Sequence, residues 1–198
     1  MRRLPTNFED AVEADQNQPT GDRLRRLLRE GYRVDGKNPF PVLLYGPTGT
    51  GKSYCAALAY AQHETQALWY KASRFVRDIN TCRSSRSKTV ACPYQGGDPQ
   101  FFGNRYDRTE AKLFEMASNS NILWVIDELA LENKTPSARD IMYDLLDCRQ
   151  KRPTVVTCNL DLAAIADDYD DRVASRLACG MQLLVDGEDR RAQNGVSR

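Results

Sequence analysis

Apolar residues along the chain gather in five short runs, at residues 42–45, 67–71, 122–126, 154–158 and 181–185. Most of these runs are continuous rather than alternating, which is typical of strands buried on both faces of a sheet. Helical spacing precedes the first run and recurs between the others, at residues 23–30, 53–63, 109–118 and 137–150. We expect Ser137 to cap the last of these helices. Strands that alternate with helices predict an α/β fold with a mostly parallel sheet.

The length of 198 residues suits one α/β domain. We place this domain at residues 41–191, after an N-terminal extension at 1–40 and before a flexible tail at 192–198. Residues 81–105 fit neither period, and their Cys-Pro, Gly-Gly and Asp-Pro pairs predict a long surface insertion.

The net charge is only +1, so any contact with nucleic acid must come from a local concentration of Lys and Arg. No stretch approaches the roughly 18 apolar residues of a membrane helix, and the N-terminus lacks the apolar core of a signal peptide. The sequence therefore predicts a cytoplasmic protein with no membrane partner. The six cysteines form no C-x-x-C pair, which favours reduced thiols. The only histidine, His63, has no nearby nucleophile to activate, and we assign it no catalytic role.

The strongest chemical signal is a G-x-x-x-x-G-K-[ST] motif between the first apolar run and the helix that follows it. Its glycines let the backbone curl, so that N–H groups and the positive end of the helix dipole point at a polyphosphate. Lys52 would reach the β- and γ-phosphates, and the hydroxyl of Ser53 would coordinate Mg²⁺. We predict a nucleotide-binding loop made of Gly46, Pro47, Thr48, Gly49, Thr50, Gly51, Lys52, Ser53 and Tyr54.

Two adjacent carboxylates, Asp127 and Glu128, end the apolar run at 122–126. Ligands of α/β proteins bind at this carboxyl edge of the sheet. Asp127 would hold Mg²⁺ through its waters, and Glu128 would orient the water that attacks the γ-phosphate. Alone, such a pair equally suits a solvated strand end, but the phosphate loop upstream favours a Walker B motif.

Asn159 follows the next apolar run, where its amide can bond to the attacking water or to the γ-phosphate. The alternative is an ordinary turn residue. Arg172 and Arg176 are four residues apart and share one helix face. An arginine that reaches the γ-phosphate of a neighbouring subunit makes hydrolysis depend on assembly. The alternative is a solvated pair bound to Asp168 or Asp171.

The segment from residue 71 to residue 112 contains nine Lys or Arg but only four acidic residues, and aromatic residues are interleaved with them. Basic charge attracts phosphates and aromatic rings stack on unpaired bases, so this segment predicts a contact with single-stranded DNA. A solvated loop with its aromatic residues folded inward is the alternative. The candidate contacts are Arg74, Arg77, Arg83, Arg86 and Lys88.

In their order and spacing, these motifs resemble the AAA+ ATPases of the bacterial initiator and helicase-loader branch, over residues 40–191. The resemblance implies a P-loop NTPase with three α-β-α layers, a parallel five-stranded sheet in the order 5-1-4-3-2 and a reduced or absent helical lid. It also implies ATP and Mg²⁺ as cofactors and a homo-oligomer on DNA, with a replicative helicase or a transposase as the protein partner. It assigns the trans-acting arginine to Arg176, with Arg172 in support. The resemblance further implies Arg190 as a lid arginine and a position for Phe8 near the adenine.

Three other functions are compatible with parts of the pattern. A transposition regulator of the IstB or TnsC kind shares all the motifs. A small P-loop kinase would use the phosphate loop, but has no reason for the acid pair followed by Asn159. A nucleotide-gated adaptor would bind ATP without turnover, and Glu128 argues against it.

Overall fold

The computed structural model describes residues 38–62, 66–84, 109–130 and 134–187. Within them, one five-stranded sheet has the order β2-β3-β4-β1-β5, and every neighbouring pair is parallel. This is the predicted order 5-1-4-3-2 counted from the opposite edge. The strands are β1 (Val42–Tyr45), β2 (Gln66–Lys71), β3 (Ile122–Leu129), β4 (Thr154–Cys158) and β5 (Met181–Leu184).

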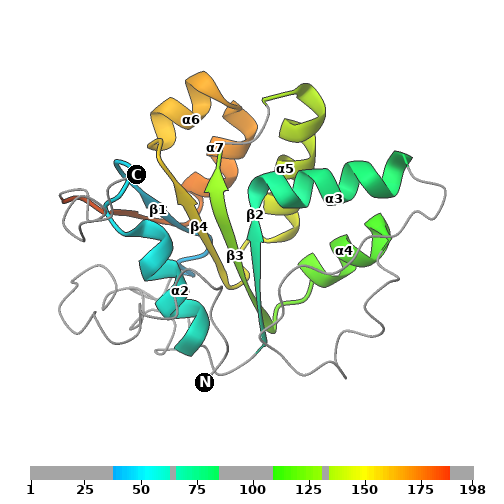
Figure 1. Cartoon of the computed structure of the whole chain (residues 1–198), viewed down its shortest axis with the longest axis horizontal. Coiled ribbons are helices and arrows are strands. Elements are labelled where there is room, and N and C mark those ends of the chain that lie inside the picture. Colours follow the sequence, from blue (N-terminus) through cyan, green and yellow to red (C-terminus); the bar gives the residue numbers. More distant parts are fainter. Residues whose placement is uncertain (1–37, 63–65, 85–108, 131–133, 188–198) are drawn as a thin grey trace, which may run out of the picture.

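Helices cover both faces of the sheet and complete the three layers (Figure 1). Helix α2 lies against one face, and α3, α4, α5 and α7 lie on the other. The helix bounds are α2 (Lys52–Gln62), α3 (Ala72–Ser84), α4 (Glu110–Ala117), α5 (Pro136–Cys148), α6 (Leu162–Asp168) and α7 (Asp171–Ala178).

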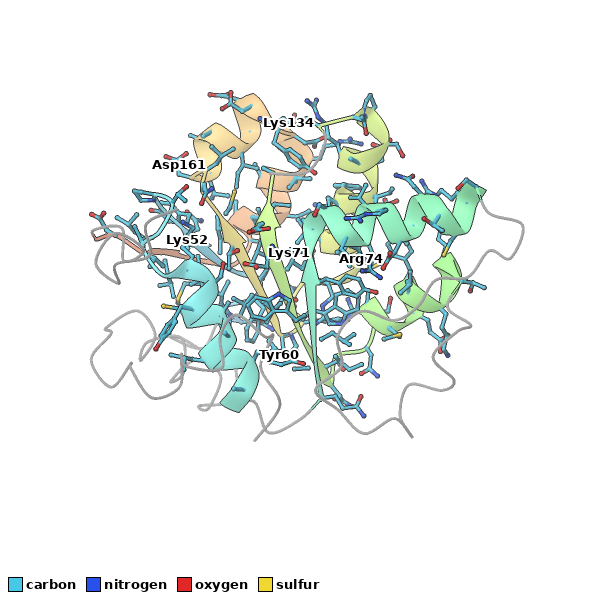
Figure 2. The ribbon with its side chains drawn as sticks, in the orientation of Figure 1. Lys52, Tyr60, Lys71, Arg74, Lys134 and Asp161 are labelled. Carbon is cyan, nitrogen blue, oxygen red and sulfur yellow. The ribbon has the colours of Figure 1, made fainter. Side chains whose placement is uncertain are left out.

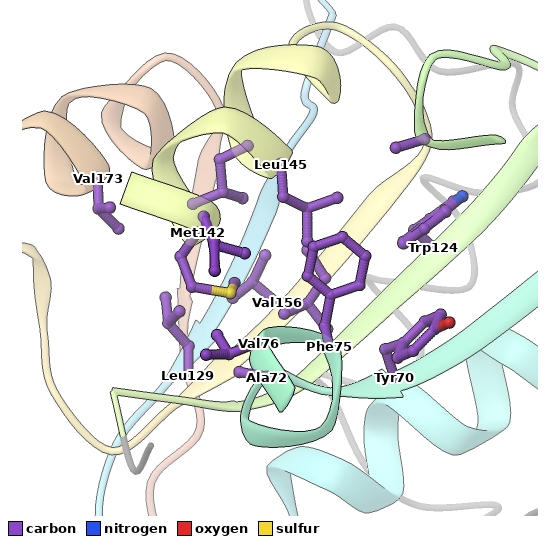
Figure 3. Close-up of a cluster of buried hydrophobic side chains, with 14 of the residues drawn as sticks. Tyr70, Ala72, Phe75, Val76, Trp124, Leu129, Met142, Leu145, Val156 and Val173 are labelled. Carbon is purple, nitrogen blue, oxygen red and sulfur yellow. The ribbon is translucent and has the colours of Figure 1, made fainter. Parts of the chain in front are cut away.

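Each face of the sheet has its own apolar core. Under α3 and α5, the rings of Tyr70 and Trp124 stack 5.6 Å apart, and Phe75 meets both edge-on (Figure 3). Under α2 the helix contributes mainly alanines, whose small side chains let it lie close to the strands. The sheet is therefore fixed from both sides, and its carboxyl edge is a rigid platform for side chains.

Two local predictions differ from the structure. Thr135, not Ser137, caps α5: its hydroxyl accepts from Ala138 N at 3.2 Å, because Pro136 occupies the first helical position. Helix α3, which was not predicted, runs from Ala72 to Ser84, so residues 81–84 of the predicted irregular segment are helical. Phe75, Ile79 and Cys82 recur on its buried side, a helical period that the polar residues between them conceal.

Several predictions lie outside the described residues: the helix at 23–30, Phe8, His63, most of the segment 81–105, Arg190 and the tail at 192–198. The cysteines within the described part are free thiols. None of the helices in that part is both long and apolar enough to cross a membrane.

Candidate functional site

The glycine loop joins β1 to α2 at the carboxyl edge of the sheet. Gly46 has φ 141° and Gly49 has φ 86°, values that L-residues rarely adopt. A Cβ on Gly46 would also lie 2.4 Å from the carbonyl oxygen of Val185, beside β5. The tight curl of the loop therefore depends on both its backbone conformation and the absence of a side chain.

Lys52 begins α2, and its buried ammonium lies against the loop (Figure 2). Its Nζ donates to the carbonyl oxygens of Gly46 at 2.8 Å and Pro47 at 2.5 Å. Thr50 Oγ1 also donates to Pro47 O, at 2.9 Å. The first turn of α2 contains no acidic residue, so its dipole and the lysine together favour an anion here.

Ser53 and Asp127 come from α2 and β3 and meet directly, with Ser53 Oγ donating to Asp127 Oδ1 at 2.7 Å. Burial raises the pKa of Asp127, while the hydroxyls of Thr157 and Ser53 act in the opposite direction. A buried carboxylate beside a hydroxyl fits Mg²⁺, whose charge would compensate for the desolvation. No group of three His, Cys, Asp or Glu gathers among the described residues, so such an ion would rely on water and phosphate for further ligands.

Glu128 has a left-handed backbone, with φ 60°, and the β3–β4 register shifts between Ile126 and Leu129. This conformation is unfavourable for a residue with a side chain and is typical of functional sites. The carboxylate of Glu128 is half-exposed, and its Oε2 lies 2.8 Å from Nζ of Lys71, the last residue of β2. In the sequence Lys71 belongs to the basic segment predicted to contact DNA, whereas the structure pairs it with the predicted catalytic acid.

Thr157, a functional residue that the sequence motifs do not include, links the two acids. Its Oγ1 donates to Asp127 Oδ1 at 2.7 Å and accepts from Glu128 N at 3.0 Å. The available signal was a hydroxyl inside an apolar strand, shortly before Asn159. Asn159 itself is exposed just past β4, the strand that lies between β1 and β3. The predicted loop, acid pair and asparagine therefore share one edge of the sheet.

The arginines of α7 form a separate group around Tyr143 of α5. The guanidinium carbons of Arg172 and Arg176 lie 5.2 and 5.1 Å from the centre of the Tyr143 ring. Arg176 Nη2 donates to Tyr143 Oη at 2.7 Å, and its Nε lies 2.8 Å from Asp147 Oδ1. Arg172 pairs with Asp140 and Asp170, so the partners are not the predicted Asp168 and Asp171.

Three of the predicted DNA contacts lie on α3. Arg83 binds Glu110 through two nitrogens, and Arg74 pairs with Asp78. Arg77 is exposed and has no ion-pair partner among the described residues. Arg86 and Lys88 lie outside them.

Arg149 is fully buried, although the sequence places it like a surface residue at the end of a helix. Its guanidinium donates to Thr154 Oγ1 and to four carbonyl oxygens, those of Ala117, Asn119, Ile122 and Pro153. Burial lowers its pKa to about 9. These partners adjoin the amino ends of β3 and β4, so Arg149 stabilises the edge of the sheet opposite the site.

The family model described as ATPase family associated with various cellular activities (AAA) matches residues 42–179. The chain belongs to this AAA family. No curated protein sequence matches it.

Solved structures with the same fold include replication proteins. A DnaA replication initiator bound to AMPPCP and single-stranded DNA has a TM-score of 0.63 and 12% identity, and the alignment covers 93% of this chain and 51% of that one. The DnaI structure has a TM-score of 0.62 and 17% identity, and the alignment covers 93% of this chain and 96% of the DnaI chain. The DnaC helicase loader has a TM-score of 0.62 and 14% identity, and the alignment covers 92% of this chain and 100% of the DnaC chain. This AAA chain thus spans about half of the DnaA chain. At these identities the similarity establishes the fold.

Proposed function

We propose that this AAA protein is a Mg²⁺-dependent, DNA-associated ATPase that self-assembles, hydrolyses ATP between subunits and acts in helicase loading during replication. The observation that carries the proposal is the contact of Ser53 with Asp127, which joins the phosphate loop to the acid pair. A loop that only bound phosphate would need neither Asp127 nor the adjacent Glu128 beside it.

In this proposal Lys52 turns from the carbonyl oxygens of Gly46 and Pro47 to the phosphates of ATP. Mg²⁺, held by Ser53 and, through water, by Asp127, would supply positive charge for the β- and γ-phosphates. Glu128 leaves Lys71, orients the attacking water and accepts its proton. Asn159 senses the γ-phosphate from the neighbouring strand end, and Gly46–Ser53 and Tyr54 hold the nucleotide.

Arg176 is proposed to act on the ATP of the next subunit, supported by Arg172. In this structure both arginines contact α5, and Arg172 also contacts Asp170, which caps its own helix. Their charge would therefore reach a γ-phosphate only across an interface, and hydrolysis would require a homo-oligomer.

Single-stranded DNA is the proposed nucleic-acid partner, with Arg77 the first contact to test. The DnaA relative bound to single-stranded DNA supports this choice. Arg77→Glu should weaken binding of a fluorescent oligonucleotide, most strongly at low salt. Lys151→Glu, at the opposite edge of the sheet, is the matched charge reversal. Equal affinity of the two variants would reject α3 as the contact, and Arg74 and Arg83 with it; Arg86 and Lys88 would need charge reversals of their own.

A transposition regulator is the second candidate, because it would use the same site. The fold shared with DnaI and DnaC favours helicase loading. Pull-down with a replicative helicase or a transposase from the same genome would separate the two. A P-loop kinase is disfavoured by the Ser53–Asp127–Glu128 geometry.

The principal test is the ATPase rate per subunit against protein concentration, with and without single-stranded DNA. We expect the rate to rise with concentration and with DNA, and Lys52→Ala to abolish ATP binding in calorimetry. Lys151→Ala, which removes an exposed amine far from the loop, is the control. Absence of any heat from ATP and Mg²⁺ with the wild-type protein would overturn the proposal.

A further inference from the structure

We propose that Thr157 is the positioning residue of this site, and that its single hydroxyl fixes the orientation of both carboxylates of the acid pair. The inference rests on the proposed function, since it concerns Mg²⁺-ATP at the glycine loop. Thr157 belongs to none of the motifs named above.

The hydroxyl of Thr157 is held in place by its surroundings. The side chain is 1% exposed and comes from β4, which has a hydrogen-bonded strand on each side. Threonine is branched at Cβ, so its χ1 has little freedom in a packed strand. The Oγ1 atom uses its only proton on Asp127 Oδ1 and accepts from Glu128 N. Both contacts therefore form together or fail together.

For Asp127, the consequence is a defined carboxylate plane. Thr157 of β4 and Ser53 of α2 both donate to Oδ1, each at 2.7 Å. Two donors on one oxygen restrict rotation of the carboxylate and leave Oδ2 for the water shell of a cation. Without Thr157, only the Ser53 hydroxyl remains, and Ser53 is itself the predicted metal ligand.

For Glu128, the consequence is a stabilised kink. The register shift takes its N–H out of the ordinary β3–β4 ladder, and Thr157 Oγ1 replaces the missing carbonyl acceptor. The left-handed backbone that aims Glu128 at Lys71 thus has a specific hydrogen bond holding it. Thr157 lies on β4, and Asn159 directly follows that strand. The hydrogen bond between Thr157 and Glu128 therefore also connects the acid pair to the strand that positions Asn159.

The test compares Thr157→Val, which keeps the shape and removes the hydroxyl, with Thr157→Ser, which keeps the hydroxyl. We expect Val to raise the Mg²⁺ concentration for half-maximal ATP binding and to lower kcat, each by about 10- to 100-fold. Nucleotide affinity measured in EDTA should not change. Ser should recover both quantities to within a few-fold, which a purely structural role would not predict.

Thr154→Val is the matched control, because it removes a buried hydroxyl from the other end of the same strand, where Thr154 contacts Arg149 and Arg152. It should lower the melting temperature and leave the Mg²⁺ dependence unchanged. If Thr157→Val does not fold, Thr157→Cys replaces it, since a thiol of similar size is a weak hydrogen-bonding group.

A folded Val or Cys variant with the wild-type Mg²⁺ dependence would overturn the role of Thr157 and leave the ATPase proposal intact. A wild-type protein that binds no Mg²⁺-ATP would instead remove the proposed function itself. The two failures are therefore distinguishable in the same titration.

Discussion

The acid pair and the arginine pair of this AAA domain are held in opposite ways. Around Asp127, which is 2% exposed, hydroxyls from α2 and β4 both donate to one carboxylate oxygen. Around Arg172 and Arg176, two of the three carboxylate partners are at the surface: Asp140 is 59% and Asp147 51% exposed, whereas Asp170 is 8% exposed. Buried charge-assisted hydrogen bonds are lost only at a high cost, whereas exposed ion pairs contribute about 0–1 kcal/mol.

The difference indicates a division of labour. The groups that would act on their own nucleotide are preorganised, as efficient catalysis requires. The arginines that would act on a neighbour's nucleotide are held by contacts that are easily exchanged, with Tyr143 as the common element. Glu128 is intermediate, because its backbone is fixed by Thr157 and its carboxylate by an exposed Lys71.

Removal of Arg176, the predicted trans-acting arginine, should have the largest effect on turnover. Arg176→Ala should lower kcat by about 10³-fold or more, because trans-acting arginines contribute on that scale, with ATP affinity unchanged. The measurement is steady-state ATPase at a concentration that saturates assembly. Arg172→Ala should have the smaller effect expected of a supporting residue. Full turnover by Arg176→Ala would remove the inter-subunit mechanism.

Glu128→Gln should test the acid pair, lowering turnover by about 10²-fold or more while ATP stays bound. Filter binding after a single turnover would detect the trapped nucleotide. Mixing this variant with Arg176→Ala sharpens the comparison. Each alone is inactive, but a mixed interface combines Glu128 of one subunit with Arg176 of the other and should regain activity. A mixture that stays inactive would indicate that both residues act within one chain.

The surroundings of the acid pair were easier to predict from the sequence than those of the arginine pair, for a physical reason. The glycine loop and the Asp127-Glu128 pair are contiguous motifs, and their edge of the sheet follows from parallel topology. Thr157 reads as an ordinary strand residue, because its value depends on the register of β4 against β3. Tyr143 and Arg149 likewise acquire their partners only when α5 packs on the sheet. Thr135 was missed because Pro136 moves the helix start.

Asp147→Asn should test the arginine pair by changing the carboxylate partner of Arg176 instead of the arginine itself. The substitution removes the charge that holds Arg176 Nε, so the arginine should transfer to a neighbour's phosphate more readily. Because an exposed pair contributes at most about 1 kcal/mol, we expect up to a five-fold lower concentration for half-maximal ATPase activity. Asp144→Asn changes an exposed acid on the same helix that forms no ion pair with Arg176, and should leave that concentration unchanged. A higher half-activation concentration would show that Asp147 supports assembly instead.

The smallest effect concerns Asp170, which caps α7 through Val173 N and Arg172 N. Its hydrogen bond with the Arg172 guanidinium, together with those from the two backbone amides, lowers its pKa. A pKa that is depressed on folding adds stability above the unfolded value of about 3.9 and loses it as the pH falls through the folded value. Asp170→Ala should therefore reduce the free energy of unfolding by about 1 kcal/mol at pH 7. In urea titrations this difference should shrink below about pH 4, whereas Asp170→Asn, which keeps the cap without the charge, should lose less at pH 7. A difference that is independent of pH would show that the charge of Asp170 adds no measurable stability, through either the backbone amides or the Arg172 guanidinium.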